Sequence, residues 1–133
     1  MAIVKNSYFY TNLTKHGAGY DYAKVKRWTK KMPVLDADKI LIPINANKTH
    51  WVLGCVNIRD KRIEFYDSLS DGTTMFAEEL RKVEPNWKPI NPFIYLSKMR
   101  MWIKDEYKDK KGQDEDMSKW ADYAPIPPQQ QNG

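Results

Sequence analysis

The stretch HWVLGCVNIRDKRIEFYD, residues 50–67, decides the fold class of this chain of 133 residues. Residues 51–58 and 62–66 are rich in β-branched and aromatic side chains, and the polar triplet RDK between them is typical of a turn. The two segments therefore predict a β-hairpin. The segment ILIPI, residues 40–44, comes before the hairpin. It predicts a short strand that is buried on both faces, because it is almost wholly apolar.

Helical segments flank these strands. Residues 21–31 predict an amphipathic helix with Asp21 as its N-cap and Pro33 as its stop. Its apolar stripe consists of Val25, Trp28 and Met32. Residues 73–83 predict a second helix. Strands and helices mixed in this way, in a chain too short for two domains, predict one α+β domain with a small central sheet.

The segment from about residue 85 to residue 119 has no clear period. Three prolines interrupt its beginning, and a run of mixed charges fills residues 104–116. Mixed charges of this kind usually remain in solvent. We therefore interpret residues 85–119 as a charged, partly helical insertion and expect the core to assemble without residues 98–116.

The composition limits the classes of function. The net charge of +5 favours an acidic partner surface, and the short basic tract at residues 24–31 is too small to indicate nucleic acid. With a single cysteine, Cys55, the chain has no internal disulfide framework, which is typical of a reducing, intracellular compartment. The first ten residues are too polar for a signal peptide, and no apolar run predicts a membrane helix.

His50 and Asp67 are the first candidates for chemistry. His50 opens the first strand of the predicted hairpin and Asp67 closes the second, so both residues belong to the same edge of the sheet. A carboxylate near an imidazole fixes its tautomer and stabilises its charged form, as in a nucleophile–His–Asp triad. Without further context, however, a surface histidine and a turn aspartate explain the same pattern.

Four blocks, taken in order, supply that context. They are KRWTKK at residues 26–31, His50-Trp51, YDSL at residues 66–69, and PQQQNG at residues 128–133. The order resembles the catalytic domain of the ubiquitin-like-protease family, whose best-known members are the SUMO-specific (sentrin-specific) proteases. That family's blocks are a tract like YxKVKRWTKK, then PIxxxxHW, then YDSL and PQQxNGSDCG. The resemblance covers roughly residues 6–84 and 117–133.

The resemblance implies a papain-like cysteine protease fold and a role for each matching residue. His50 matches the general base, and Asp67 matches the acid that orients it. Gln130 matches the glutamine of the oxyanion hole. Trp51 matches the tryptophan over the Gly-Gly tail of the substrate, and Arg27 matches a basic position at the SUMO-binding surface. The implied partners are a SUMO-like protein and its conjugates. We expect a monomer that acts in the nucleus or cytoplasm, and the family analogy favours the nucleus.

The nucleophile is the residue that the blocks do not supply. In the family it is a cysteine three residues after the glycine that matches Gly133, so we expect the coding sequence to continue with Ser-Asp-Cys-Gly. Cys55 comes five residues after His50, in the wrong order, and its apolar surroundings predict a core residue. The chain is therefore interpreted as the N-terminal part of a catalytic domain whose nucleophile-bearing helix is missing, and as inactive alone. The alternative is a truncated, non-catalytic paralogue that binds a ubiquitin-like modifier.

Other classes of site have little support. With two histidines and one cysteine, the sequence does not predict a structural zinc site. Gly17 and Gly19 are not followed by a phosphate-loop pattern, so no nucleotide cofactor is expected. The basic and aromatic residues of 93–111 are interpreted as a solvated insertion with a few buried aromatics rather than a nucleic-acid surface. We expect no cofactor, no metal and no membrane partner.

Overall fold

The structure is a computed structural model that describes residues 1–15, 19–30, 32–46, 50–67, 79, 82–83 and 91–124. For His50 it describes the backbone. Of the helix predicted at residues 73–83, only residues 79, 82 and 83 lie within these ranges, and all three are helical. The remainder of that prediction lies outside the described residues.

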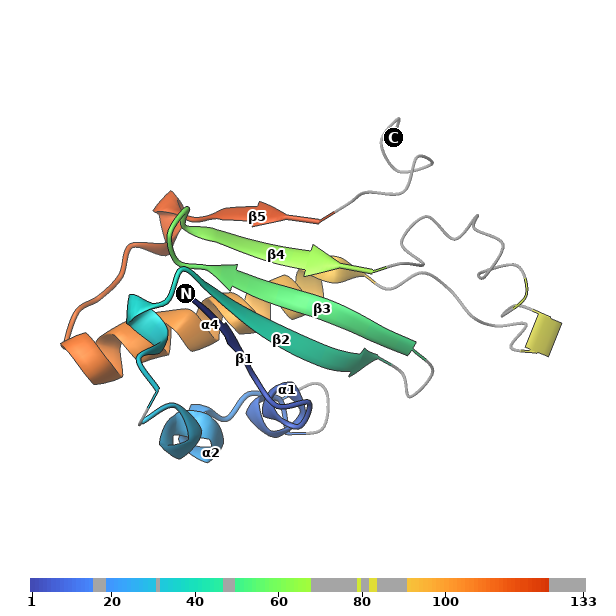
Figure 1. Ribbon diagram of the computed structural model, residues 1–133, viewed down its shortest axis with the longest axis horizontal. Helices are drawn as coiled ribbons and strands as arrows, with labels where there is room; N and C mark the ends of the chain where they lie inside the picture. Colours follow the sequence, from blue (N-terminus) through green and yellow to red (C-terminus); the bar gives the residue numbers. More distant parts are fainter. Residues whose placement is uncertain are drawn as a thin grey trace.

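A five-stranded sheet organises the described part of the chain (Figure 1). The strands follow one another across the sheet in chain order. The outer pairs, β1 with β2 and β4 with β5, are parallel, whereas the inner pairs are antiparallel. The strands are β1 (Ala2–Val4), β2 (Lys39–Ala46), β3 (His50–Asn57), β4 (Arg62–Tyr66) and β5 (Ala121–Tyr123). The hairpin predicted from residues 51–66 is therefore confirmed as β3 and β4.

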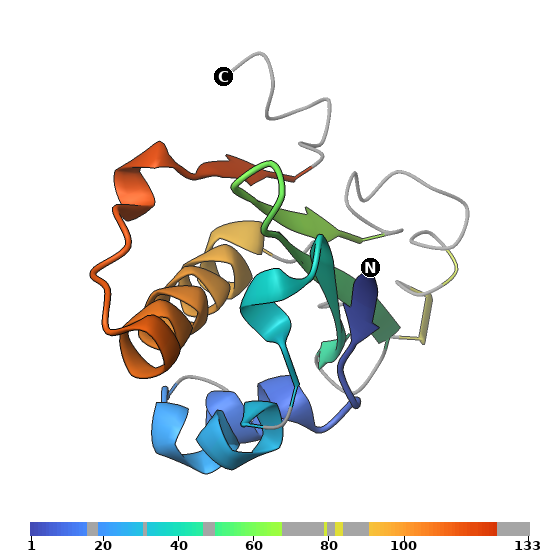
Figure 2. The same cartoon turned by 60° about the vertical axis from the view of Figure 1, so that its left-hand side comes forward.

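Helices cover one face of this sheet. The long helix α4 (Pro92–Lys111) crosses that face, and the short helices α1 and α2 lie beside it (Figure 2). The remaining elements are α1 (Phe9–Leu13), α2 (Tyr22–Lys26), and the 3₁₀ turns η1 (Arg27–Thr29), η2 (Val34–Asp36) and η3 (Met117–Lys119). Together with the sheet they confirm the α+β class. No helix within the described ranges is long and apolar enough to cross a membrane.

The α4 helix has clear signals at both ends. Asn91 is its N-cap, and its side chain accepts a hydrogen bond from the backbone N–H of Phe93 at 3.0 Å. Pro92 occupies the first helical position, where no backbone donor is needed. Gly112 ends the helix in the left-handed conformation, with φ of 62°, and its N–H bonds to the carbonyl of Lys108.

The core corrects the prediction that residues 85–119 are a solvated insertion. Leu96, Met99, Trp102 and Ile103 on α4 are all buried in the core. The expected helical part of the segment is present as α4, but the apolar stripe of this helix is a central part of the core. A Cβ placed on Gly54 would lie 2.5 Å from the Met99 sulfur, so β3 and α4 are closely packed at this point. Removing residues 98–116 would therefore take away one side of the core.

Burial of β2 corrects a second prediction. Ile40, Ile42 and Ile44 are buried, whereas Leu41 and Pro43 on the other face are partly exposed. Only one face of β2 is covered, because the described helices all lie on the same side of the sheet. The opposite face also carries the exposed Trp51 of β3. An apolar run can thus belong to a strand with one open face.

The helix predicted at residues 21–31 is shorter than expected. Regular α-helix ends at Lys26 and a 3₁₀ turn follows, with Val25 and Thr29 as the buried residues. Trp28, expected on the apolar stripe, is 41% exposed and touches Phe9 at a ring-centroid distance of 6.5 Å. Asp21 occupies the N-cap position, but its side chain makes no capping hydrogen bond.

Candidate active site

His50 is the first residue of β3. Its backbone pairs with Ala46, the last residue of β2, so β2 ends and β3 begins at the same edge of the sheet. Trp51 follows it, opposite Asn45, with 56% of its surface exposed. A tryptophan this exposed at a strand end is available to contact a ligand.

Asp67 directly follows β4. β3 and β4 are antiparallel, so β4 ends near the start of β3. Tyr66, the last residue of β4, pairs with Leu53, which lies three positions after His50 on β3. Asp67 therefore lies at the end of the sheet where β3 begins, on the right in Figure 1. This register agrees with the edge position predicted for the two residues. Asp67 is also well buried, with 8% of its surface exposed.

An aromatic group next to Asp67 was not anticipated from the sequence. Tyr95 near the start of α4 has a raised pKa because it is partly buried and because the negative charge of Asp67 is nearby. Its ring stacks on Phe65 at 5.1 Å and on Tyr10 at 5.5 Å. The signal was present in the sequence, since Tyr95 and Met99 share the i, i+4 spacing of one helix face. These stacked rings form an aromatic wall beside Asp67.

Gln130 lies outside the described residues. The described chain ends at Ala124, just after β5, which runs parallel to β4 with Tyr123 opposite Glu64. Because parallel strands point the same way, the backbone leaves β5 toward the sheet end that carries Asp67.

Arg27 is exposed on η1, apart from the His50–Asp67 end of the sheet. The next residues of its turn contact the other half of α4, where Thr29 meets Glu106. Glu106 is eleven residues beyond Tyr95, a separation of roughly 16 Å along the helix axis. The structure therefore separates the candidate modifier-binding residue from the candidate catalytic pair.

Cys55 is buried in the middle of β3, as predicted. It is 2% exposed and lies between Leu41 of β2 and Glu64 of β4. Burial, together with the negative charge of Glu64, raises the pKa of its thiol to about 11. A nucleophilic cysteine needs a lowered pKa and access to substrate, and Cys55 has neither. Within the described residues, no group of three or more His, Cys, Asp or Glu side chains could hold a metal ion.

Comparison with known proteins shows the family of the chain. Residues 2–133 match the Ulp1 protease family, C-terminal catalytic domain. The chain belongs to this family. The resemblance inferred from the four sequence blocks is thereby confirmed, and so is the fold class that it implied.

Individual relatives agree. Ubiquitin-like-specific protease 1 of Saccharomyces cerevisiae is 34% identical over 114 residues, which cover 84% of this chain and 15% of that protein. Putative ubiquitin-like-specific protease 1B of Arabidopsis thaliana is 33% identical over 133 residues, covering 96% of this chain and 33% of that protein.

Among solved structures, the C-terminal Ulp1 protease domain in complex with Smt3, the yeast ortholog of SUMO, superposes with a TM-score of 0.62 at 30% identity. The match covers 95% of this chain and 48% of that one. The chain therefore spans about half the length of the solved domain and a smaller share of the curated relatives.

Proposed function

We propose that this chain contributes the histidine–aspartate part of a SUMO-specific cysteine protease, which processes SUMO precursors and removes SUMO from conjugates. One observation carries the proposal. In a chain of the Ulp1 protease family, His50 and Asp67 stand at the same end of adjacent antiparallel strands. Its relatives include ubiquitin-like-specific proteases, and one solved relative is in complex with Smt3, the yeast ortholog of SUMO. An intracellular, reducing setting suits such an enzyme, because it keeps a catalytic thiol reduced.

Each residue has a role in the proposed reaction. His50 takes the proton of a cysteine thiol, and the thiolate attacks the carbonyl carbon of the second glycine in the modifier's Gly-Gly tail. Asp67 holds the imidazole in the correct tautomer and stabilises its charged form. The amine leaves with the proton from His50, and water then hydrolyses the thioester. Gln130 donates a hydrogen bond to the oxyanion in both steps, which is worth a factor of roughly 100 to 1,000 in rate.

Two residues are proposed to bind the modifier. Trp51, exposed beside His50, packs over the Gly-Gly tail and positions the scissile bond. Arg27, exposed on η1, contacts an acidic part of the modifier's surface, which agrees with the chain's net charge of +5. Because Arg27 is distant from the catalytic pair, it should affect binding more than the chemical step.

The thiolate in this proposal is not that of Cys55. These 133 residues carry the proposed base and its orienting acid, but their single cysteine is a buried thiol of raised pKa. The cysteine would be the one that the family carries beyond the position of Gly133. This observation also favours a second candidate for the 133 residues alone, a module that binds a SUMO-like protein without cleaving it.

A cleavage assay separates these possibilities. A SUMO–reporter fusion is incubated with the 133-residue chain and with a chain that continues through the family's cysteine, and products are followed on gels. We expect no turnover by the first and turnover by the second, and neither should cleave a ubiquitin fusion. Turnover by the 133-residue chain that disappears in Cys55→Ala would contradict both the assignment of the nucleophile and the inert character of Cys55.

A further inference from the structure

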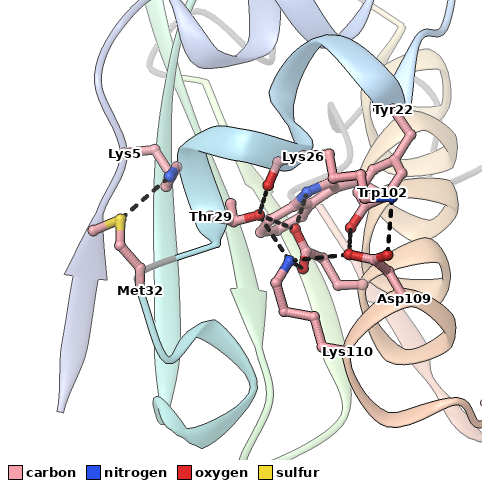
Figure 3. Close-up of polar contacts among 9 residues, drawn as sticks. Lys5, Tyr22, Lys26, Thr29, Met32, Trp102, Asp109 and Lys110 are labelled. Atoms are coloured by element: carbon pink, nitrogen blue, oxygen red, sulfur yellow. Dashed lines mark hydrogen bonds and ion pairs between the residues drawn. The ribbon is translucent and has the colours of Figure 1, made fainter.

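The carboxylate of Glu106 is completely enclosed between α4 and the N-terminal helical segment. It is 0% exposed and, in a polar cluster, forms hydrogen bonds with Thr29, Trp102 and Lys110. Figure 3 labels these three partners. The Trp102 indole donates to Oε1 at 3.1 Å, and the Lys110 ammonium donates to Oε2. A buried charge without such partners would strongly destabilise the fold.

Thr29 connects this cluster to a different element. Its hydroxyl lies 2.6 Å from Glu106 Oε1 and 3.1 Å from the carbonyl oxygen of Lys26. A hydroxyl has one proton, and the shorter contact to a charged acceptor is the stronger hydrogen bond, so we assign the proton to Glu106. The same oxygen accepts a hydrogen bond from Lys110 Nζ at 3.0 Å. Thr29 is thus held by both members of an ion pair on α4.

Besides Thr29, the η1 turn contacts the core through the Trp28 ring, whose centroid lies 6.5 Å from that of Phe9. The η1 turn is three residues of 3₁₀ helix, a geometry with poorer hydrogen bonds than the α-helix. Thr29 is fully buried, whereas Arg27 and Trp28 in the same turn are exposed. Lys26, just before the turn, adds a partly exposed ion pair with Asp109 at 3.2 Å. Fixing Thr29 therefore fixes the backbone from which Arg27 and Trp28 project.

We propose that Glu106 is a positioning residue for recognition of the modifier. Through Thr29 it fixes η1 on α4 and so presents Arg27 and Trp28 as a rigid basic and aromatic surface for an acidic partner. The inference rests on the proposed function, because that proposal places Arg27 in the modifier-binding surface. A preorganised surface binds more tightly, since less conformational entropy is lost on association.

Two substitutions at one position separate this role from simple packing. Thr29→Val keeps the shape of the side chain and removes the hydroxyl, whereas Thr29→Ser keeps the hydroxyl and removes a methyl group. Affinity of the 133-residue chain for a fluorescently labelled SUMO protein is measured by anisotropy, and hydrogen exchange is measured at the amides of residues 27–30. We expect Thr29→Val to weaken binding roughly fivefold, the scale of one hydrogen bond, and to speed this local exchange. Thr29→Ser should behave like the wild type in both measurements.

A charge-matched pair on α4 tests the same link from the other side. Lys110→Met removes the ammonium that holds Glu106 and Thr29, and Lys108→Met removes an equal charge whose partner, Asp114, lies in solvent. We expect weaker binding and faster exchange at residues 27–30 only for Lys110→Met. Equal effects of the two variants would mean that net charge alone matters, and would overturn the positioning role.

The remaining outcomes are distinguishable. If Arg27→Glu weakens binding but Thr29→Val binds and exchanges like the wild type, the positioning inference is wrong and the proposed function stands. If Thr29→Ser is as impaired as Thr29→Val, the methyl group matters as much as the hydroxyl and the inference is also wrong. If Arg27→Glu binds like the wild type, or the wild-type chain binds no SUMO protein, the proposed binding surface fails and the inference falls with it.

Discussion

The setting of a single thiol decides what chemistry these residues can perform alone. Cys55 is surrounded by the sheet, opposite Leu41 and Glu64, and 2% of its surface is exposed. Its pKa is raised from the ordinary value of 9.0 to about 11, first by burial and then by Glu64. At neutral pH the group is a protonated thiol that substrate cannot reach. It behaves as a small apolar core residue.

The raised pKa of Cys55 predicts a loss of stability in alkali. The folded chain retains a proton that the unfolded chain releases, so this contribution is fully present below about pH 9 and is lost as the pH rises to about 11. We expect the free energy of unfolding of the wild type to fall by on the order of 2 kcal/mol more than that of Cys55→Ala over this interval. Urea unfolding at several pH values measures the difference. The buried tyrosines titrate in both proteins, so their contributions to the difference cancel. If the free energy of unfolding fell equally with pH in both proteins, burial of the Cys55 thiol would be contradicted.

At this residue the sequence was sufficient, because an apolar strand interior predicts burial of a cysteine within it. Tyr95 shows the opposite case. It lies 28 positions after Asp67 in the sequence, and only the packing of α4 against β4 brings the two together. Nothing in the local pattern around Asp67 indicates the aromatic wall beside it.

Among the elements, α4 has the largest effect on the core. Its buried stripe recurs at intervals of three and four residues and ends in the Glu106 cluster. Its lysines lie mainly on the outer face, where Lys104 and Lys108 are exposed. The helix thus combines a core face with a strongly charged solvent face.

Adjacent residues of α4 provide a matched test of this arrangement. Trp102 is fully buried and packs edge-on against Phe9 at a ring-centroid distance of 5.0 Å, whereas Met101 is 42% exposed. We expect Trp102→Ala to destabilise the fold by about 3–5 kcal/mol and Met101→Ala to change stability by less than about 0.5 kcal/mol. Chemical denaturation of the two variants checks this. Similar stabilities would mean that α4 is not part of the core.

The sequence predicted the hairpin well and α4 poorly, for physical reasons. β3 and β4 are adjacent in the chain, and a polar turn between two β-rich segments is a local signal. In α4, Pro92 resembled a helix breaker, although it occupies the first turn, where proline is tolerated. Glu106 interrupts the apolar pattern of α4, and a carboxylate is not expected in a core. Its burial depends on Thr29, 77 positions earlier in the sequence.

For the molecule as a whole, the sheet brings several candidate residues to one end. The start of β3 and the ends of β2 and β4 meet there, with β5 pointing the same way (Figure 1). Antiparallel topology was enough to predict that His50 and Asp67 share this end, and their catalytic roles remain predictions. The position of Arg27, near the opposite half of α4, could not be predicted, because it depends on tertiary packing of α2 and η1.

This separation has a consequence for a partner. A protein that contacts Arg27 and also enters the His50–Asp67 end must span the separation between them. The α4 residues near each, Glu106 and Tyr95, are roughly 16 Å apart along the helix axis. A small globular protein with an extended tail has suitable dimensions. Charge near Arg27 should then control affinity in a salt-dependent way, whereas residues at the sheet end should control turnover.

The most direct test of the account is the turnover number of a His50→Ala variant. The protein used is a chain that carries the family's cysteine, the substrate is a SUMO–reporter fusion at saturating concentration, and His16→Ala, at the chain's other histidine, is the control. If His50 is the general base, its loss should lower kcat by at least about 1,000-fold, and the control should stay close to the wild type. A His50→Ala variant with near-normal kcat would contradict the proposed catalytic role of this sheet end.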